Sequence, residues 1–263
     1  MAKMRLDQLV VDRGLAPSRA AAQALILAGE LEMPSAGTRN LRPGQQVAAD
    51  VELRIRDRPR WASRAGGKLE AALDVFDLDP TGLACLDAGA STGGFTDVLL
   101  ARGARIVYAV DVGRGQLAER LRADRRVVSM ERVNLRTLAS LPEPVDLATL
   151  DLSFISLALV LPAVRRLLRP EGQAIALVKP QFEAGREAVP RGGVVTDPAV
   201  HRDVLVRLRA HAERASFGAA GLIRSPVTGT DGNVEFLALL GPAPGLGAPA
   251  WEEAVAAAMP ASA

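Results

Sequence analysis

The chain has 263 residues, of which 49% are hydrophobic and 24% charged, with a formal net charge of +2 and a sequence pI of about 9.1. This size allows one mid-sized domain with a substantial core and a small additional one. The charge permits a nucleic-acid partner without requiring one. The single cysteine, Cys85, excludes an intramolecular disulfide and a cysteine metal cluster, so we expect a reduced, cytoplasmic setting and no metal. We find neither a secretory signal nor an apolar stretch that could span a bilayer.

The first 60 residues are expected to form a small α+β module. Apolar residues at helical spacing predict a helix that ends near Gly14, and Ser18 can cap a second helix from Arg19 to Ala28. Short strand-like runs follow, and the last of them covers Val51 to Ile55. This module holds ten basic and seven acidic residues, so it carries the positive charge of the chain. Residues 58 to 61 are expected to be a linker.

Strands and helices are predicted to alternate from residue 65 onwards. The predicted strands cover 83–88, 105–111, 127–130, 145–150 and 173–178; the predicted helices cover 68–75, 95–101 and 157–168, and Asp197 opens another. Apolar strands that alternate with helices indicate a parallel sheet covered on both faces. The fold class is therefore α/β, a doubly wound, Rossmann-like sheet over residues 61–246, and the last strands, 222–226 and 234–240, form an antiparallel hairpin. We expect residues 247–263 to be a frayed tail, and His201 and His211 to lie at the surface.

A glycine-rich turn, Gly89 to Gly94, follows the first apolar strand of this second domain. Glycine at a strand-to-helix turn allows positive φ angles and a close approach of ligand to backbone. The spacing differs from the dinucleotide pattern G-x-G-x-x-G, and no P-loop lysine follows. Asp111, at the end of the next strand, can bind the ribose hydroxyls of an adenosine cofactor. Together these features favour S-adenosylmethionine over a dinucleotide.

Only three lysines stand beside 29 arginines, so a retained lysine hints at chemistry that guanidinium cannot perform. Asp151 and Lys179 each follow a strand and are expected at the carboxyl edge of the sheet, although a helix cap or a solvated charge would also explain them. Glu235 interrupts an apolar strand and needs a partner, which Lys68 can supply. Two lysines and two carboxylates around one crevice suit the deprotonation of an alcohol nucleophile.

Six stretches of the sequence together resemble the FtsJ/RrmJ-like family of ribose 2′-O-methyltransferases. They are 63–69, 87–95, 111–117, 151–156, 178–182 and 232–236. Nearly the whole chain is similar to the TlyA subfamily, which has also been labelled haemolysin. The resemblance implies a Lys-Asp-Lys-Glu tetrad, here Lys68, Asp151, Lys179 and Glu235, that methylates the ribose of a cytidine in ribosomal RNA of one or both subunits.

The same resemblance implies a set of binding residues. The methionine part of S-adenosylmethionine would lie on Gly89, Ala90, Ser91, Thr92, Gly93, Gly94 and Phe95, its ribose on Asp111 and its adenine near Asn134. The N-terminal module would be an RNA-binding domain of a ribosomal-protein type, and RNA phosphates would contact Arg5, Arg19 and Arg64. Residues 30–37 depart from the strand-turn-strand that usually closes this module, which puts the choice of RNA site in doubt.

Three other functions compete with this reading. A membrane-lytic protein would need a span, an export signal or a long basic amphipathic helix, and the sequence has none of them. A methyltransferase for a base or small molecule would not need two lysines. An RNA-binding protein with an inactive catalytic domain would keep the fold without transferring a methyl group. The sequence does not indicate an oligomeric state.

Overall fold

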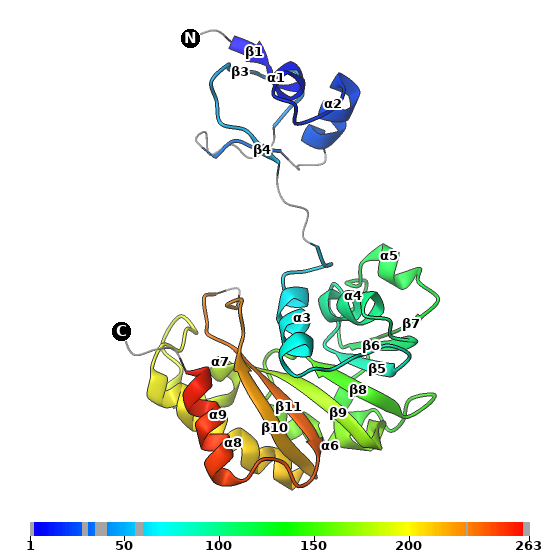
Figure 1. Ribbon diagram of the computed structural model, residues 1–263, viewed down its shortest axis with the longest axis vertical. Coiled ribbons are helices and arrows are strands. Elements are labelled where there is room, and N and C mark those ends of the chain that lie inside the picture. The colour runs from blue at the N-terminus through cyan, green and yellow to red at the C-terminus, as the bar shows by residue number, and fades with distance from the viewer. Residues whose placement is uncertain (1–2, 28–30, 35–40, 56–59, 230, 260–263) are drawn as a thin grey trace. The chain divides into compact units, whose positions relative to one another are not determined.

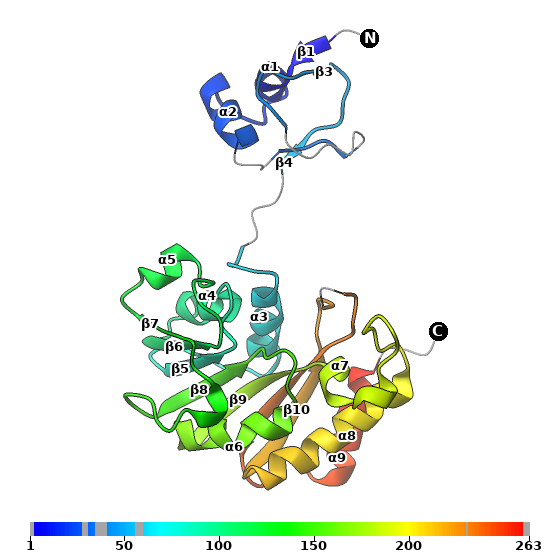
Figure 2. The ribbon, with the colours of Figure 1, turned by 180° about the vertical axis from the view of Figure 1, so that it is seen from behind.

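The computed structural model describes residues 3–27, 31–34, 41–55, 60–229 and 231–259. The chain divides into two compact units, Met1–Arg60 and Trp61–Ala263 (Figures 1 and 2). The predicted end of the second helix at residues 28–29, and residues 58–59 of the predicted linker, lie outside the described residues. So do positions 30 and 35–37 of the stretch that departs from the family pattern.

The first unit packs two short helices against two small antiparallel sheets. The helices are α1 (Leu6–Asp12) and α2 (Arg19–Leu27); β1 (Lys3–Arg5) pairs with β3 (Gln46–Ala48), and β2 (Leu31–Glu32) pairs with β4 (Arg54–Ile55). The hydroxyl of Ser18 accepts a hydrogen bond from the backbone N–H of Ala21 at 3.2 Å, as a cap at this position should. The apolar core of the first unit consists of helix residues such as Leu6, Val10 and Ile26 together with residues of the strands.

The second unit is built on a seven-stranded sheet in the order β10-β11-β9-β8-β5-β6-β7. The strands are β5 (Ala84–Ala88), β6 (Ile106–Asp111), β7 (Val127–Glu131), β8 (Val145–Leu150), β9 (Leu168–Val178), β10 (Phe217–Arg224) and β11 (Phe236–Pro242). Strands β5 to β9 pair in parallel, whereas β11 pairs antiparallel with both β9 and β10. The predicted hairpin is therefore present, formed by the consecutive strands β10 and β11.

Two apolar layers cover the two faces of this sheet. One layer includes residues of α6 (Leu157–Leu167), α8 (Pro198–Arg214) and α9 (Ala248–Ala258). The other includes residues of α3 (Ala65–Val75), α4 (Gly94–Ala101) and α5 (Glu119–Arg122). Neighbouring residues of one strand belong to opposite layers, as Cys85 and Leu86 do, because side chains alternate along a strand. Short helices α7 (Pro180–Glu183), η1 (Leu135–Thr137) and η2 (Arg186–Ala188) complete the unit.

The end of the described chain corrects one expectation. Residues 248–258 were expected within a frayed tail, but they form helix α9, and Trp251 is only 1% exposed. Its indole N–H donates to the carbonyl oxygen of Leu205 on α8 at 3.0 Å. Alanine-rich composition does not reveal such docking, because the decisive contacts come from a helix far earlier in the chain.

His201 corrects a second expectation. It was expected at the surface of a charged helix, yet it is 1% exposed and its Nε2 lies 2.9 Å from the carbonyl oxygen of Val195. Its ring meets that of Phe236 edge to face, with centroids 5.8 Å apart. The charged neighbours of His201 occupy the other faces of α8, so the local charge did not reveal its burial. The predicted cap of this helix is present, since Asp197 accepts from the N–H of Ala199 at 2.8 Å.

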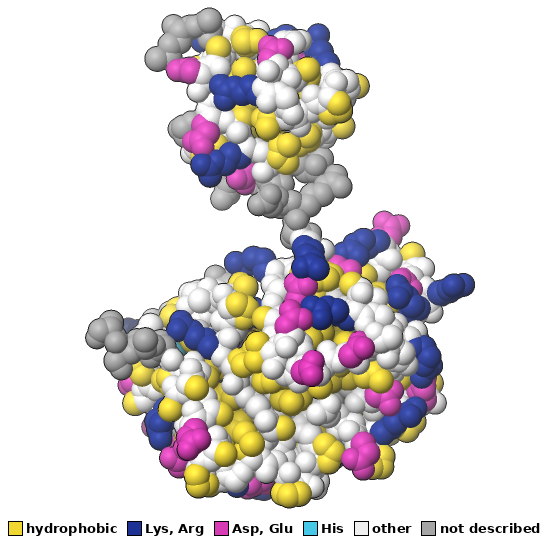
Figure 3. All heavy atoms as spheres, in the orientation of Figure 1, with side chains coloured by type: hydrophobic (Ala, Val, Ile, Leu, Met, Phe, Trp, Pro, Cys, Tyr) yellow, Lys and Arg dark blue, Asp and Glu magenta, His cyan; other side chains and the backbone are white. Residues whose placement is uncertain are grey.

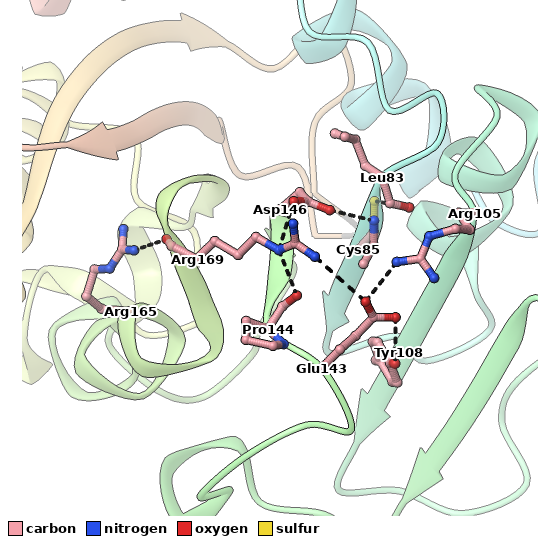
Figure 4. A network of polar contacts seen from close by, with 10 residues as sticks. Leu83, Cys85, Arg105, Tyr108, Glu143, Pro144, Asp146, Arg165 and Arg169 are labelled. Atoms are coloured by element: carbon pink, nitrogen blue, oxygen red, sulfur yellow. Dashed lines mark hydrogen bonds and ion pairs between the residues drawn. The ribbon is translucent and has the colours of Figure 1, made fainter.

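An arginine network ties together the edge of the sheet at which β8 begins (Figure 4). Glu143 binds Arg105 at 2.8 Å, and Arg169 lies 3.2 Å from Asp146. Asp146 also accepts from the backbone N–H of Ala84 at the start of β5. These contacts hold the first residues of neighbouring strands in register, so the opposite edge, where the strands end, is left for ligands.

Candidate active site

Parallel strands bring the ends of β5, β6, β8 and β9 to one edge of the sheet, where the predicted site residues follow them. The glycine-rich turn after β5 depends on two glycines. Gly89 has a φ of +85°, and a Cβ added there would lie 2.4 Å from the carbonyl oxygen of Asp151. Gly93 has a φ of +95°, and its added Cβ would lie 2.3 Å from a methyl group of Leu121. Larger residues would push the turn away from the Asp151 loop and from α5 (Glu119–Arg122).

Two cavities open beside this turn. The first has a volume of about 310 Å³ and is lined by all four residues of the predicted tetrad. The second has a volume of about 460 Å³ and is lined by Asp111, Asn134 and apolar residues of neighbouring loops. Four residues line both cavities, namely Gly89, Ser91, Asp151 and Ser153. The two cavities therefore adjoin, and a ligand can extend from one into the other.

Asp111 organises the second cavity. One carboxylate oxygen accepts from the N–H of Ser91 at 2.8 Å, and the other accepts from the N–H of Gly113 at 2.7 Å. Each oxygen has a second lone pair, so the carboxylate can still accept hydrogen bonds from a ligand's hydroxyls. Asn134 uses its side-chain oxygen to cap η1 at the N–H of Arg136, 3.0 Å away, and no residue in the described part of the chain accepts a hydrogen bond from its amide N–H groups.

The tetrad residues form two ion pairs in the first cavity. Nζ of Lys68, on α3, contacts the carboxylate of Glu235, just ahead of β11, and both side chains are below 10% exposed. Nζ of Lys179, at the end of β9, lies 2.6 Å from Asp151 at the end of β8, and these side chains are 12% and 19% exposed. Residues 167 positions apart are thus joined in one pair, whereas the second pair joins neighbouring strands.

Lys179 has two further neighbours that the sequence did not indicate. Its Nζ donates to the hydroxyl of Ser153 at 3.1 Å, and it lies 5.9 Å from the ring centroid of Phe182. Ser153 is exposed and stands two residues after Asp151. The only sequence signal for Ser153 was its place in a loop that already held a predicted catalytic residue.

Asp87 also lines the first cavity. It is fully buried, and its carboxylate accepts from the backbone N–H of Thr96 at 2.8 Å and from the Thr96 hydroxyl at 2.6 Å. Burial raises the pKa of Asp87 to about 7, the Thr96 hydrogen bonds oppose that rise, and the nearby charge of Asp151 adds to it. Because Thr96 lies in the first turn of α4, Asp87 ties the end of β5 to the helix that follows the glycine-rich turn.

Two aromatic rings pair near Asp151: Phe154 lies on the same loop, and Phe182 lies on α7. Phe154 is 90% exposed and has a φ of +63°, and its ring centroid lies 5.0 Å from that of Phe182. Both rings line a further cavity of about 830 Å³, together with Arg136 and Gln181. An exposed aromatic ring beside an arginine can stack a nucleobase. Composition did not suggest this platform, because only 3% of the residues are aromatic.

The predicted RNA-binding arginines occur in both units. In the first unit, buried Asp7 accepts from Arg5 at 2.9 Å and from Arg19 at 3.0 Å, while both arginine side chains stay about half exposed. The hydrogen bond from Arg5, with those from Gln23 and Arg19, holds the pKa of the Asp7 carboxyl well below its usual range. In the second unit, Arg64 is exposed and lines the tetrad cavity. Basic and acidic side chains are interspersed over the visible face of that unit (Figure 3).

Comparison with known proteins identifies the family. The model of the FtsJ-like methyltransferase family matches residues 61–241. The chain belongs to this family. YqxC of Bacillus subtilis, which is named as an rRNA methyltransferase, is 48% identical to this FtsJ-like methyltransferase over 239 residues, 89% of this chain and 84% of that protein. The 16S/23S rRNA (cytidine-2'-O)-methyltransferase TlyA of Mycobacterium tuberculosis is 45% identical over 240 residues, 89% of this chain and 88% of its own.

A solved structure from Streptococcus thermophilus that carries a hemolysin label is also similar. It is 42% identical, with a TM-score of 0.73, and the match covers 98% of this chain and 96% of that one. The predicted family resemblance and the α/β methyltransferase fold are therefore confirmed. Across the described part of the chain, we find no helix long and apolar enough to cross a membrane. Nor do the described residues include a group of three or more His, Cys, Asp or Glu placed to hold a metal ion.

Proposed function

We propose that this FtsJ-like methyltransferase transfers a methyl group from S-adenosylmethionine to the 2′-hydroxyl of a ribose, that of a cytidine, in ribosomal RNA. The observation that carries the proposal is the pair of adjoining cavities: one lined by two lysine–carboxylate pairs, the other by Asp111 and Asn134. The names of the relatives TlyA and YqxC support ribosomal RNA as the substrate, and the name of TlyA supports cytidine.

The residues of the second cavity fit the cofactor. Asp111 keeps free lone pairs for the two ribose hydroxyls, and Asn134 offers amide N–H groups to the ring nitrogens of adenine. Apolar side chains of Val110, Val133 and Ile155 line the same cavity and suit the flat adenine faces. The turn from Gly89 to Phe95 would hold the methionine part, because its glycines let the ligand approach the backbone.

The first cavity supplies the chemistry at the hydroxyl. When bound, S-adenosylmethionine supplies an electrophilic methyl group. Lys179, in its neutral form, accepts the proton of the 2′-hydroxyl at Nζ, and Asp151 then partners the ammonium that results. Lys68 pairs with Glu235 in the less exposed part of the cavity, and its positive charge stabilises the oxygen as it loses the proton. The proton leaves Lys179 for solvent once the methylated ribose has departed.

Other residues would hold the RNA. Arg5 and Arg19, oriented by Asp7, would contact phosphates, and Arg64 would do so at the mouth of the tetrad cavity. The exposed ring of Phe154 offers a surface on which an unstacked base can rest. A ribose presented with its base out of the helix reaches the tetrad without the enzyme entering a groove.

The test is transfer of labelled methyl groups to unmodified ribosomal subunits, small and large assayed separately. We expect alkali-resistant ribose methylation at a cytidine with the wild type. Lys179→Ala should lose transfer by at least about a hundredfold while still binding the subunit. Transfer to a base, or no transfer by a wild type that binds RNA, would refute the proposal.

The hemolysin label on a similar structure defines the alternative outcome. Lysis of erythrocytes by the purified wild type, with equal lysis by Lys179→Ala and no methylation of either subunit, would favour the membrane-lytic function. Binding of subunits without transfer or lysis would favour an RNA-binding protein.

A further inference from the structure

Ser153 stands where the two cavities of the second unit adjoin. It is one of four residues that line both cavities, and the other three, Gly89, Ser91 and Asp151, already have a place in the proposed cofactor or tetrad sites. Ser153 has an exposed side chain, so a bound substrate can reach its surroundings. Its hydroxyl is directed at the Nζ of Lys179, 3.1 Å away.

The backbone around Ser153 is anchored on both sides. The N–H of Asp151 donates to the carbonyl oxygen of Ala88 at 3.0 Å, and Phe154 takes a left-handed conformation with a φ of +63°. At the far end of the loop, Glu183 accepts from the Ser156 hydroxyl at 2.7 Å and from the N–H of Leu157 at 2.8 Å. A loop held at both ends fixes the backbone position of Ser153, and the hydrogen bond with Lys179 holds its hydroxyl.

The geometry of an amine explains what the hydroxyl can do. A lysine Nζ has three positions around it, apart from its bond to carbon. Asp151 occupies one of them at 2.6 Å and Ser153 a second, so only the third is open to the substrate. When Lys179 is neutral, its two N–H groups point at these two acceptors, and the lone pair is left for the third position. Without the Ser153 hydroxyl, the lone pair of Lys179 can point to either of two positions, and only one of them faces the substrate.

We propose that Ser153 is a positioning residue that aims the lone pair of Lys179 at the hydroxyl to be methylated. This inference rests on the proposed function, because it assigns to Lys179 the acceptance of the proton. Ser153 acts only through Lys179: it takes no proton from the substrate and forms no bond to the methyl group.

The test compares Ser153→Ala, which removes the hydroxyl, with Ser153→Thr, which keeps it, in the full-length protein. The matched control is Ser140→Ala, an exposed serine of the second unit that lines neither cavity. Each protein is assayed for methyl transfer to unmodified subunits, and its affinity for S-adenosylmethionine is measured by calorimetry. A lost hydrogen bond of ordinary strength lowers kcat by about three- to tenfold.

We expect that loss of kcat for Ser153→Ala, with KM for the subunit and Kd for S-adenosylmethionine both within about twofold of wild type. Ser153→Thr should recover kcat to within about twofold, and Ser140→Ala should match the wild type. A wild-type kcat for Ser153→Ala overturns the inference. So does a loss of cofactor affinity equal to the loss of kcat, or a failure of threonine to restore kcat. If the wild type transfers no methyl group, the proposed function fails and the inference with it, whereas the preceding results leave the proposed function intact.

Discussion

The two lysine–carboxylate pairs of the site differ in their access to water. Lys68 and Glu235 are 8% and 3% exposed, whereas Lys179 and Asp151 are 12% and 19% exposed. A deeply buried charge depends on its partner, because the interior cannot solvate it once the partner is removed. A pair nearer the cavity mouth can recruit water in place of a lost partner. The two lysine–carboxylate pairs are therefore expected to contribute differently to the stability of the protein.

This difference predicts unequal costs for two isosteric changes. Glu235→Gln leaves the Lys68 ammonium buried without its counter-charge and should destabilise the protein by about 3 kcal/mol. Asp151→Asn should cost less than about 1 kcal/mol. Urea unfolding followed by tryptophan fluorescence measures both, since Trp61 and Trp251 belong to the second unit. Equal losses for the two variants would contradict the argument from burial.

Asp87 predicts a pH dependence of stability. Folding raises its pKa from an ordinary 3.8 to about 7, so between these values the folded protein holds a proton that the unfolded chain releases. Raising the pH across this interval therefore favours the unfolded chain. Relative to Asp87→Asn, which has no such proton, the wild type should lose roughly 2–4 kcal/mol of stability from pH 4 to pH 7. Urea midpoints at several pH values test this, and parallel pH profiles would exclude the raised pKa.

At the scale of elements, the first cavity contains residues from a helix and a loop that are far apart in the sequence, in addition to residues at the ends of the strands. Helix α3 precedes β5 and supplies Lys68, while the loop ahead of β11 supplies Glu235, and they meet because β11 inserts beside β9. Helix α9 likewise depends on contacts with earlier elements, since it packs on α8 and β10 at the end of the described chain. The final helix thus belongs to the second unit, although its composition suggested otherwise.

Helix α9 is expected to contribute substantially to stability. Trp251 is almost fully buried and donates its indole N–H to Leu205. Trp251→Ala removes a large apolar contact and the hydrogen bond that the indole N–H donates, so it should cost about 3–5 kcal/mol. Differential scanning calorimetry measures the loss. As a control, Glu253→Ala, at an exposed position of the same helix, should leave stability within about 0.5 kcal/mol. A Trp251→Ala variant as stable as this control would mean that the helix is only loosely docked.

At the scale of the whole molecule, the two units have separate cores. The core of the first consists of residues 6–53, and both apolar layers of the second consist of residues after 68. Among the described residues, no buried core residue belongs to both units. Each unit is therefore stabilised by its own packing. The proposed roles are also separate: Arg5 and Arg19, proposed to contact RNA, belong to the first unit, and the two cavities belong to the second.

A fragment of residues 60–263 should therefore fold and bind S-adenosylmethionine with nearly the affinity of the full chain. Its kcat/KM for ribosomal subunits should fall by at least about a hundredfold, because the phosphate contacts proposed for the first unit are lost. Calorimetry and methyl transfer assays measure the two quantities separately. If the fragment methylates subunits as well as the full chain does, the first unit has no part in RNA binding.

Much of the fold was predictable because it depends on local patterns. Apolar strands that alternate with helices indicated the sheet, and Asp197-Pro198 marked the start of α8. The pairing of Lys179 with Asp151 followed from the rule that parallel strands end at one edge. The burial of His201 and the docking of α9 were not predictable, because each depends on contacts with distant segments.

The sequence by itself determined which residue types stand at the proposed site: it has lysine at positions 68 and 179 of an arginine-rich chain, and glycine where a side chain would strike Asp151. Only the tertiary structure decided their partners. It places Lys68 beside Glu235, which is 167 positions away in the sequence, and Ser153 beside Lys179. It also buries Asp87, and this burial raises the pKa of the Asp87 carboxyl. The physical reason is that the residue type sets which chemical group a side chain carries. The protonation and the orientation of that group depend on neighbouring residues, which come together only in the folded chain.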